Sequence, residues 1–368
     1  MKNARILYDR SCVNSDLLYS CHFKAADPFC YFEHGSDRVI AVSKLELGRA
    51  QKQARRDVKV VDSGTLGTGA PASVFFALCC QYGVKNVLVP VNFPFGIAEE
   101  LRALGVNVQL GPEPFMPERE WKTEQEVAMI IEAQRAAECG LKAALELLRN
   151  SDIASDGKLM FDNKPLTSEF LRGVIDAAIL QAGALAEDTI AAGNLDGADP
   201  HNTGSGILYA NYPIVMDIFP RSMRTGYWGD LTRTVVKGKA ADVVKRAFDA
   251  VLEAREASKS LLHSGRTGRE MHEFAAGILR KHGFETGIRD GVCYGFFHGL
   301  GHGVGLDIHE TPRLSPGNNR PLQGGEVVTI EPGLYDPAWG GMRLEDLMLV
   351  GEIASKCLTE AETFLEIS

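Results

Sequence analysis

The segment that decides the fold is Phe297-His298-Gly299-Leu300-Gly301-His302-Gly303-Val304-Gly305-Leu306-Asp307-Ile308-His309-Glu310. Its first half alternates glycine with larger residues from position 299 to position 305. This alternation argues against a helix, and it lets the backbone approach a ligand closely. A histidine between glycines is often an ordinary loop residue, so His302 needs support from elsewhere in the chain.

Outward from this segment, carboxylates interrupt runs that otherwise read as apolar strands. They are Asp217 in the run 214–219, Asp230 in 227–234, Glu331 directly after 327–330 and Glu345 in 342–349. An unpaired charge inside such a strand is strongly unfavourable, so something cationic is expected to meet each carboxylate. Each one alone has an ordinary explanation, such as pairing with an arginine.

Taken together, four carboxylates and one histidine on apolar strands form the ligand set of a dinuclear divalent-metal centre. Carboxylates can bridge two cations roughly 3.5–4 Å apart and offset their charge. His302 is then the only nitrogen ligand, which makes the two metal positions inequivalent. The donor set accepts manganese, cobalt or zinc, so the pattern leaves the identity of the metal open.

The chain of 368 residues is long enough for two domains. Short strand-like runs at 38–42, 58–61, 87–90 and 106–110 alternate with helical runs at 45–54, 71–82 and 98–104, which predicts a small α/β domain. Three prolines in 111–117 permit neither helix nor strand. We therefore expect an N-terminal domain at 1–115 and a second domain at 116–368.

The second domain repeats one order of elements. A helix that begins with the capping box Thr123/Glu126 and a second helix at about 167–182 precede strands at 213–219 and 229–236. Helices at about 242–262 and from the Thr267/Glu270 capping box to Gly283 then precede further strands. This predicts an α+β domain with two similar halves, whose sheets join in one curved surface under outer helices.

Composition limits the classes of partner. Lys and Arg number 39 against 48 Asp and Glu, a net charge of −9 that disfavours nucleic acid or an anionic membrane as a general partner. The apolar runs are far shorter than a membrane helix of about 20 residues. The N-terminal residues lack the apolar core of a signal peptide, and the eight cysteines include no CxxC pair, so a cytoplasmic protein with reduced thiols is expected.

These ordered motifs resemble the M24 metallopeptidases of the pita-bread fold, within the branch of Xaa-Pro aminopeptidases and prolidases. The resemblance runs from about Trp121 to the end, and more loosely through a first domain similar to that of creatinase and prolidase. It is carried by the segment at 298–310 together with 216–218, 229–234, 329–333 and 343–346. It implies two divalent ions, a short peptide substrate and a homodimer.

The resemblance also assigns roles. It implies that Asp217, Asp230, His302, Glu331 and Glu345 are the metal ligands, with Asp230 and Glu345 as the bridging carboxylates. Glu331 matches the ligand that also handles the proton of the attacking water. The resemblance implies that His201, His298 and His309 hold the substrate and take part in catalysis, and that Arg343 supports the last glutamate and the substrate.

The expected function is therefore a dinuclear-metal exopeptidase that cleaves short peptides. Two alternatives remain open: a creatinase-like amidinohydrolase or amidohydrolase that cleaves a non-peptide C–N bond, and a non-catalytic metal-binding relative. The first would be expected to lack the complete acid set and the second to have lost ligands. The segment between Asp217 and Asp230 is longer than is usual in the family, which leaves the exact specificity open.

Overall fold

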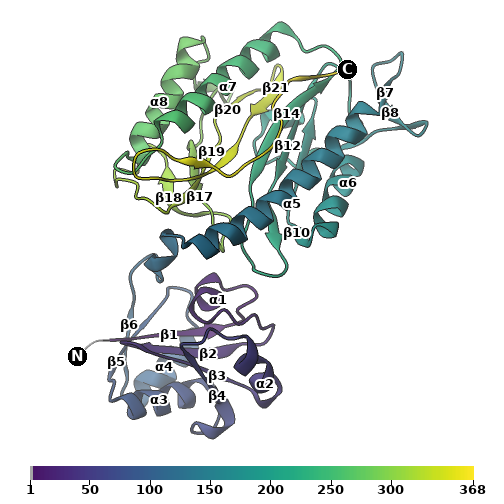
Figure 1. The fold of residues 1–368 in the computed structure, drawn as a ribbon. Coiled ribbons are helices and arrows are strands. Elements are labelled where there is room, and N and C mark those ends of the chain that lie inside the picture. The colour runs from purple at the N-terminus through teal and green to yellow at the C-terminus, as the bar shows by residue number, and fades with distance from the viewer. Residues whose placement is uncertain (1–2) are drawn as a thin grey trace. The chain divides into compact units, whose positions relative to one another are not determined.

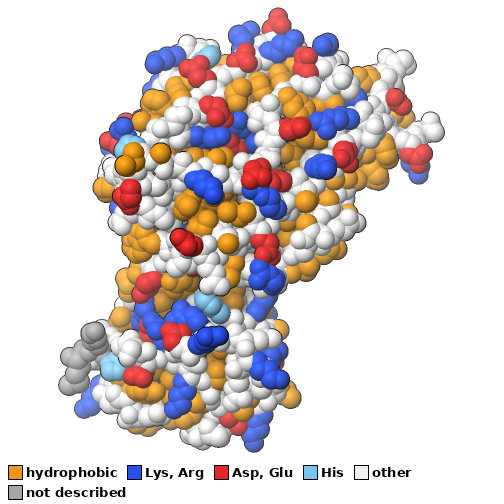
Figure 2. All heavy atoms as spheres, viewed as in Figure 1, with side chains coloured by type: hydrophobic (Ala, Val, Ile, Leu, Met, Phe, Trp, Pro, Cys, Tyr) orange, Lys and Arg blue, Asp and Glu red, His pale blue; other side chains and the backbone are white. Residues whose placement is uncertain are grey.

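The computed structural model describes residues 3–368, and the chain divides into two compact units, Met1–Arg119 and Glu120–Ser368. Figure 1 shows both units as ribbons. Figure 2 shows that Lys and Arg side chains are interspersed with Asp and Glu over the face in view. Among the described residues, no helix is long and apolar enough to cross a membrane.

The first unit contains a six-stranded mixed sheet in the order β4-β3-β2-β1-β5-β6. Its strands are β1 (Ala4–Asp9), β2 (Phe29–His34), β3 (Asp37–Val42), β4 (Val58–Asp62), β5 (Asn86–Val89) and β6 (Asn107–Leu110). Its helices are α1 (Ser15–Cys21), α2 (Lys44–Gln53), α3 (Pro71–Tyr82) and α4 (Phe95–Ala103), with a 3₁₀ turn η1 (Ser63–Thr65) and another, η2 (Pro117–Glu120), at its end.

Both faces of this sheet are buried because side chains alternate along its strands. Ile6 packs in the core that α3 and α4 cover, and its neighbour Leu7 packs in the core that α1 and α2 cover. The predicted α/β layer is confirmed. Strand β2 was not predicted from the sequence.

Two helices and then strands occur twice in the second unit. The helices are α5 (Glu124–Arg149), α6 (Ser168–Gln181), α7 (Asp242–Leu261) and α8 (Gly268–Lys281). Both predicted capping boxes are present, Thr123 with Glu126 and Thr267 with Glu270. In Figure 1 the pair α5 and α6 and the pair α7 and α8 flank the strands that lie between them. The predicted α+β class and the repeated order are confirmed.

Each half has its own main sheet. The first sheet runs β11 (Ile190–Gly193), β12 (Pro213–Ile218), β14 (Leu231–Lys237) and β24 (Glu366–Ile367). The second runs β18 (Glu310–Leu314), β17 (Gly301–Gly303), β19 (Val327–Ile330), β22 (Asp346–Leu349) and β23 (Lys356–Cys357). Helices α5 and α6 share a hydrophobic core with the first sheet, and α7 and α8 share one with the second.

Smaller ladders complete the unit. They are β7 (Asp152–Ile153), β8 (Leu159–Phe161) and β9 (Lys164–Pro165); β10 (Ala184–Ala186) with β13 (Pro220–Ser222); β15 (Gly287–Arg289) with β16 (Val292–Tyr294); and β20 (Gly333–Asp336) with β21 (Gly340–Arg343). One short 3₁₀ turn, η3 (Asp196–Ala198), follows β11.

Two details of the prediction need correction. The run 342–349 is not one strand, because β21 ends at Arg343 and β22 begins at Asp346, in a different sheet. Arg343 and Glu345 therefore do not share the face of one strand. The chain leaves β21 so that the Glu345 N–H can donate to the Thr232 carbonyl at 3.0 Å, across to the first half. The two main sheets are thus separate ladders that meet at this bond, rather than one continuous surface.

Candidate metal centre

The five predicted ligands come from both halves of the second unit. Asp217 is near the end of β12 and lies opposite Thr232 of β14. Asp230 directly precedes β14, and His302 is the middle residue of β17. Glu331 directly follows β19, while Glu345 lies between β21 and β22. Three of the five predicted ligands, Asp230, Glu331 and Glu345, thus lie directly beside a strand, whereas Asp217 and His302 belong to strands.

Three of these residues already have ligand atoms close enough together to share a metal ion. Asp230, His302 and Glu345 each offer one ligand atom, and these atoms all lie within 4.8 Å of one another. All three side chains are buried. Glu331 joins them through its Oε1, which is 3.3 Å from His302 Nε2, and Asp230 Oδ2 is 3.5 Å from the same nitrogen.

Asp217 is connected to this group through Thr232. The Thr232 hydroxyl lies 2.9 Å from Asp217 Oδ1 and 2.7 Å from Glu345 Oε2. Arg343 donates from Nε to the same hydroxyl at 3.1 Å and from Nη2 to Asp217 Oδ2 at 2.5 Å. The contact between Arg343 and the last glutamate is therefore indirect, through Thr232. Sequence reasoning did not identify Thr232, although it stands two positions after Asp230.

The backbone fixes the tautomer of His302. Its Nδ1 lies 3.1 Å from the Gly303 carbonyl oxygen, a contact in which Nδ1 must carry the proton. Burial lowers the pKa of His302 to about 3, with a further contribution from His309, so the ring is neutral near pH 7. Nε2 then presents a lone pair toward Asp230 and Glu331. This is the arrangement of a metal-ligating histidine whose other nitrogen donates to a carbonyl.

The carboxylates carry more negative charge than the surrounding residues offset. Burial raises the pKa of Asp230, and the charges of Glu345 and Asp217 raise it further. Burial, then Glu331 and Asp217, likewise raise the pKa of Glu345 well above its ordinary value. For Glu331, burial raises the pKa to about 7 although Arg343 opposes the shift.

These observations test whether a metal fits the site. The carboxylates of Asp230 and Glu345 have pKa values that neighbouring carboxylates raise. Carboxylate oxygens of Asp230 and Glu331 lie close to the unprotonated Nε2 of His302. Such a group of donors is stabilised by a divalent cation, which removes the repulsion and matches oxygen-rich ligands with one imidazole. The residues present therefore fit a divalent-metal centre.

A second polar chain leads from Arg343 to His298. Arg343 donates from Nη1 to the Tyr335 hydroxyl at 2.8 Å, and His298 Nε2 lies 3.1 Å from that hydroxyl. His298 Nδ1 lies 2.7 Å from the Gly299 carbonyl oxygen, so Nδ1 carries the proton and Nε2 accepts from Tyr335. Burial, and then the positive charge of Arg343, lower the pKa of His298 to about 3. Sequence reasoning did not identify Tyr335, which follows Glu331 by four positions.

His309 and His201 lie nearer the surface. The His309 ring meets the His302 ring edge-on, with centroids 4.4 Å apart. Desolvation lowers the pKa of His309, and Arg313 adds to the effect. His201 is exposed, and its charge lowers the pKa of both His298 and His309. His201 is thus within electrostatic range of both His298 and His309.

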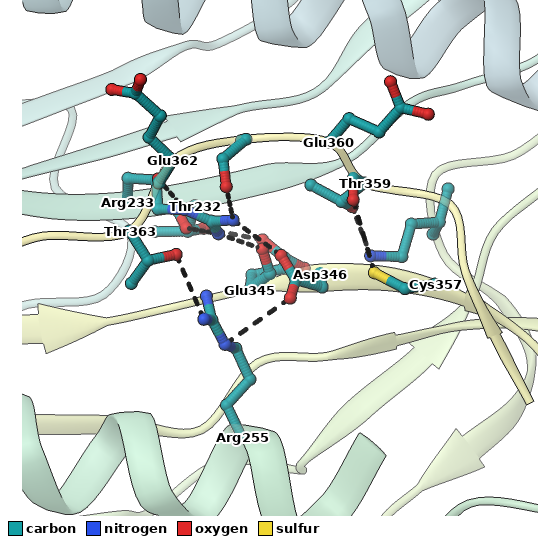
Figure 3. A network of polar contacts seen from close by, with 12 residues as sticks. Thr232, Arg233, Arg255, Glu345, Asp346, Cys357, Thr359, Glu360, Glu362 and Thr363 are labelled. Atoms are coloured by element: carbon teal, nitrogen blue, oxygen red, sulfur yellow. Dashed lines mark hydrogen bonds and ion pairs between the residues drawn. The ribbon is translucent and has the colours of Figure 1, made fainter. Parts of the chain in front are cut away.

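A buried ionic network lies next to the backbone of Glu345, and Figure 3 shows its members Arg233, Arg255 and Asp346. Arg233 donates from Nη1 to the carbonyl oxygens of Glu345 at 2.6 Å and Thr232 at 2.9 Å, and from Nη2 to Asp346 at 2.8 Å. Asp346 also accepts from Lys259 at 2.6 Å and pairs with Arg255 at 3.5 Å. Arg233 therefore binds both Thr232 and Glu345, the two residues whose backbone hydrogen bond joins the two halves. Sequence reasoning missed this network; the charged pair Glu345-Asp346 beside an apolar run was the available signal.

Comparison with protein families extends these observations. The model of metallopeptidase family M24 matches residues 128–352, which is more than half of the chain. A Xaa-Pro dipeptidase from Pyrococcus horikoshii is 30% identical over 284 residues, which cover 76% of this chain and 74% of that protein.

Solved structures agree with this family. A prolidase from Pyrococcus horikoshii is similar with a TM-score of 0.79 at 25% identity, over 98% of this chain and 94% of that one. An X-Pro aminopeptidase from Thermotoga maritima shares the fold, with a TM-score of 0.83 at 23% identity over 100% of this chain and 97% of that one. The second unit therefore has the pita-bread fold of these enzymes. The chain belongs to metallopeptidase family M24.

Proposed function

We propose that this protein is an exopeptidase that hydrolyses short peptides with proline at the second position, as a Xaa-Pro dipeptidase or aminopeptidase. The observation that carries the proposal is the convergence of Asp230, His302 and Glu345, three buried ligand atoms within 4.8 Å of one another. The names of the similar dipeptidase, prolidase and aminopeptidase support the substrate class.

We assign two divalent ions, with manganese, cobalt or zinc as candidates, to Asp217, Asp230, His302, Glu331 and Glu345. Asp230 and Glu345 are the candidates for shared ligands, because each contacts the opposite half of the unit. Asp230 Oδ2 lies 3.5 Å from His302 Nε2, and Glu345 Oε2 lies 2.7 Å from the Thr232 hydroxyl. Bound ions would supply Lewis acidity that polarises the scissile carbonyl and makes a water molecule acidic enough to attack near neutral pH.

Glu331 is the candidate proton carrier. In the metal-free protein burial raises its pKa to about 7, and its Oε1 lies 3.3 Å from His302 Nε2 among the proposed ligands. From this position the carboxylate can accept a proton from the attacking water and return one to the leaving amine. Its Oε1 lies 3.2 Å from the Thr329 hydroxyl, which donates to the carboxylate and orients it.

The histidines are candidates for substrate binding. His309 and His298 are neutral near pH 7, since the pKa of each is lowered. A neutral His309 can donate one hydrogen bond to a peptide oxygen without adding a positive charge. The single N–H of His298 is directed to the Gly299 carbonyl, so the atom it can offer is Nε2, which accepts from Tyr335 or from an N–H of the peptide. His201 is exposed and is a candidate for contact with the far end of the peptide.

The remaining assignments are also proposals. We assign residues 1–115 to an accessory domain and 116–368 to the catalytic domain, and we expect a cytoplasmic homodimer that binds neither nucleic acid nor membrane. The complete set of four acids favours a peptidase over a creatinase-like amidinohydrolase, and the retained ligands argue against a non-catalytic relative.

The test is a peptide digest with defined metals. Protein stripped with a chelator should be inactive and should regain activity with manganese, cobalt or zinc. The substrates are Ala-Pro, Ala-Pro-Phe and Ala-Ala-Phe. Cleavage of Ala-Pro alone assigns a dipeptidase, and release of alanine from Ala-Pro-Phe assigns an aminopeptidase. Full activity with the chelator present would refute the metal requirement, and equal cleavage of Ala-Ala-Phe would refute the requirement for proline.

A further inference from the structure

Helix α5 presents a buried polar side chain to the candidate metal centre. Gln134 has no exposed surface, and it lies among the alanines and leucines of the helix that form the core of the first half. A buried side-chain amide is unfavourable unless its hydrogen bonds are made, so its partners are informative.

Those partners are the two backbone groups of a single residue. The Asp230 N–H donates to Gln134 Oε1 at 2.7 Å, and Gln134 Nε2 donates to the Asp230 carbonyl oxygen at 3.0 Å. Asp230 directly precedes strand β14 and is outside the ladders of the sheet. The Gln134 amide therefore takes the place that a neighbouring strand would occupy.

The preceding glycine makes this contact possible. A Cβ at Gly229 would lie 2.6 Å from the backbone of Ala133 and Gln134. Only a residue without a side chain lets the loop approach the helix this closely. Gly229 and Gln134 together fix the distance between the Asp230 backbone and α5.

The second proton of the amide reaches the other half of the unit. Gln134 Nε2 also donates to Thr359 Oγ1 at 3.0 Å, and that oxygen accepts from the Leu347 N–H at 2.9 Å. Leu347 is in β22, two positions after Glu345. The side chain thus connects the backbone of Asp230 to the strand that follows Glu345.

We propose that Gln134 is a positioning residue that sets the distance between the Asp230 and Glu345 carboxylates and so the affinity for the shared metal ions. It contacts no ligand atom itself and acts only through the backbone of Asp230 and through Thr359. This inference rests on the proposed metal centre.

The test compares Mn²⁺ binding by the full-length protein and by Gln134→Leu, which keeps the volume and removes all three hydrogen bonds. Loss of a residue that orients a ligand typically weakens metal binding by roughly 10- to 100-fold, and we expect a rise in Kd of that size by isothermal titration calorimetry. Activity should recover at saturating Mn²⁺, since the ligands themselves remain. Thermal melting in the absence of metal separates this effect from a general loss of stability.

Two further variants keep the test decisive if Gln134→Leu does not fold. Gln134→Glu retains the acceptor for the Asp230 N–H but cannot make both donated bonds. Thr359→Val removes the two bonds that Thr359 Oγ1 accepts, from Gln134 Nε2 and from the Leu347 N–H, and leaves both bonds between Gln134 and Asp230. Both should weaken Mn²⁺ binding, and Thr359→Val should do so less than the loss of the whole amide. Gln181→Leu, at the exposed end of α6, is the matched control and should bind Mn²⁺ as the wild type does.

The outcomes distinguish the two proposals. Wild-type uptake of two Mn²⁺ ions with an unchanged Kd in the folded Gln134 and Thr359 variants would overturn the positioning role alone. A wild-type protein that binds no divalent ion would overturn the proposed function and the positioning role together. A lower melting temperature with unchanged Kd would show that Gln134 is purely structural, which also overturns the inference.

Discussion

The Thr232 hydroxyl lies 2.7 Å from Glu345 Oε2, and the Glu345 N–H donates to the Thr232 carbonyl at 3.0 Å. Thr232 belongs to β14 of the first half, whereas Glu345 precedes β22 of the second. The pair therefore joins the two halves at the point where their carboxylates meet. The hydroxyl has one proton for two carboxylates, so it orients one of them at a time.

Replacing Thr232 with valine tests this relationship. The valine keeps the shape but loses the contacts with Asp217 and Glu345, so we expect Mn²⁺ affinity to fall by roughly 10- to 100-fold. The matched control is Thr189→Val, which removes a 2.8 Å hydrogen bond to Asp176 outside the candidate metal centre. Metal binding measured by calorimetry should distinguish the two variants, and equal Kd values in both would contradict the assigned role of Thr232.

Removal of a proposed ligand should abolish activity. In Asp230→Ala or His302→Ala one of the three assembled ligand atoms is lost, and we expect hydrolysis of Ala-Pro peptides to fall to the background of the chelator-treated protein. Metal content measured by plasma mass spectrometry should fall in parallel. His282→Ala, at an exposed Glu253 contact, is the control and should retain activity. Substantial turnover by the Asp230 variant would remove that residue from the ligand set.

Metal uptake should release protons. Asp230, Glu331 and Glu345 have raised pKa values without metal, and that of Glu331 is about 7, so protons compete with the ion. We expect Mn²⁺ affinity to fall as the pH decreases below about 7. Calorimetry in two buffers of different ionisation enthalpy counts the protons released. A Kd for Mn²⁺ that stays constant between about pH 6 and about pH 8 would be inconsistent with the raised pKa values of these three carboxyl groups.

The same carboxylates should make the metal-free protein sensitive to alkali. A carboxyl with a folded pKa above its unfolded value of about 4.3 contributes stability below that value, and this contribution is lost as the pH rises through the folded pKa. For Glu331 the window lies between the unfolded value and about 7. We expect the melting temperature of chelated protein to fall from pH 5 to pH 8 relative to protein saturated with Mn²⁺. If the melting temperatures of the chelated and the Mn²⁺-saturated protein changed equally with pH, the negative charge of the carboxylates would be offset without a metal ion.

The network behind Glu345 should contribute to stability. Burial raises the pKa of Asp346, but Arg233, Arg255 and Lys259 outweigh it, so the pKa is lowered overall. A lowered pKa contributes stability that is present above the unfolded value of about 3.9 and lost as the pH falls through the folded pKa. Asp346→Asn leaves buried cations unpaired, and breaking such a group typically costs about 3–5 kcal/mol. Urea unfolding at pH 7 measures the loss, with exposed Asp249→Asn as the control that should change little.

The sequence predicted the parts of the fold that local patterns specify. Capping boxes located the starts of α5 and α8 because the cap is formed by residues three positions apart. Strand β2 was missed since every residue from Phe29 to Glu33 is buried, and such a strand has no alternation to recognise. The break between β21 and β22 was also missed, because it depends on the bond from Glu345 to Thr232 rather than on any residue nearby.

For the candidate metal centre, the sequence by itself determined which donors exist: four carboxylates and one histidine in or beside apolar strands and glycines, whose joint pattern rather than any single member indicates a metal site. Only the tertiary structure decided what holds those donors in place. Thr232 meets Glu345 across 113 residues, and Gln134 meets Asp230 across 96. Such partners have no periodic pattern in the chain, because their contacts arise only when helices and strands of both halves pack together and buried polar groups must find hydrogen bonds.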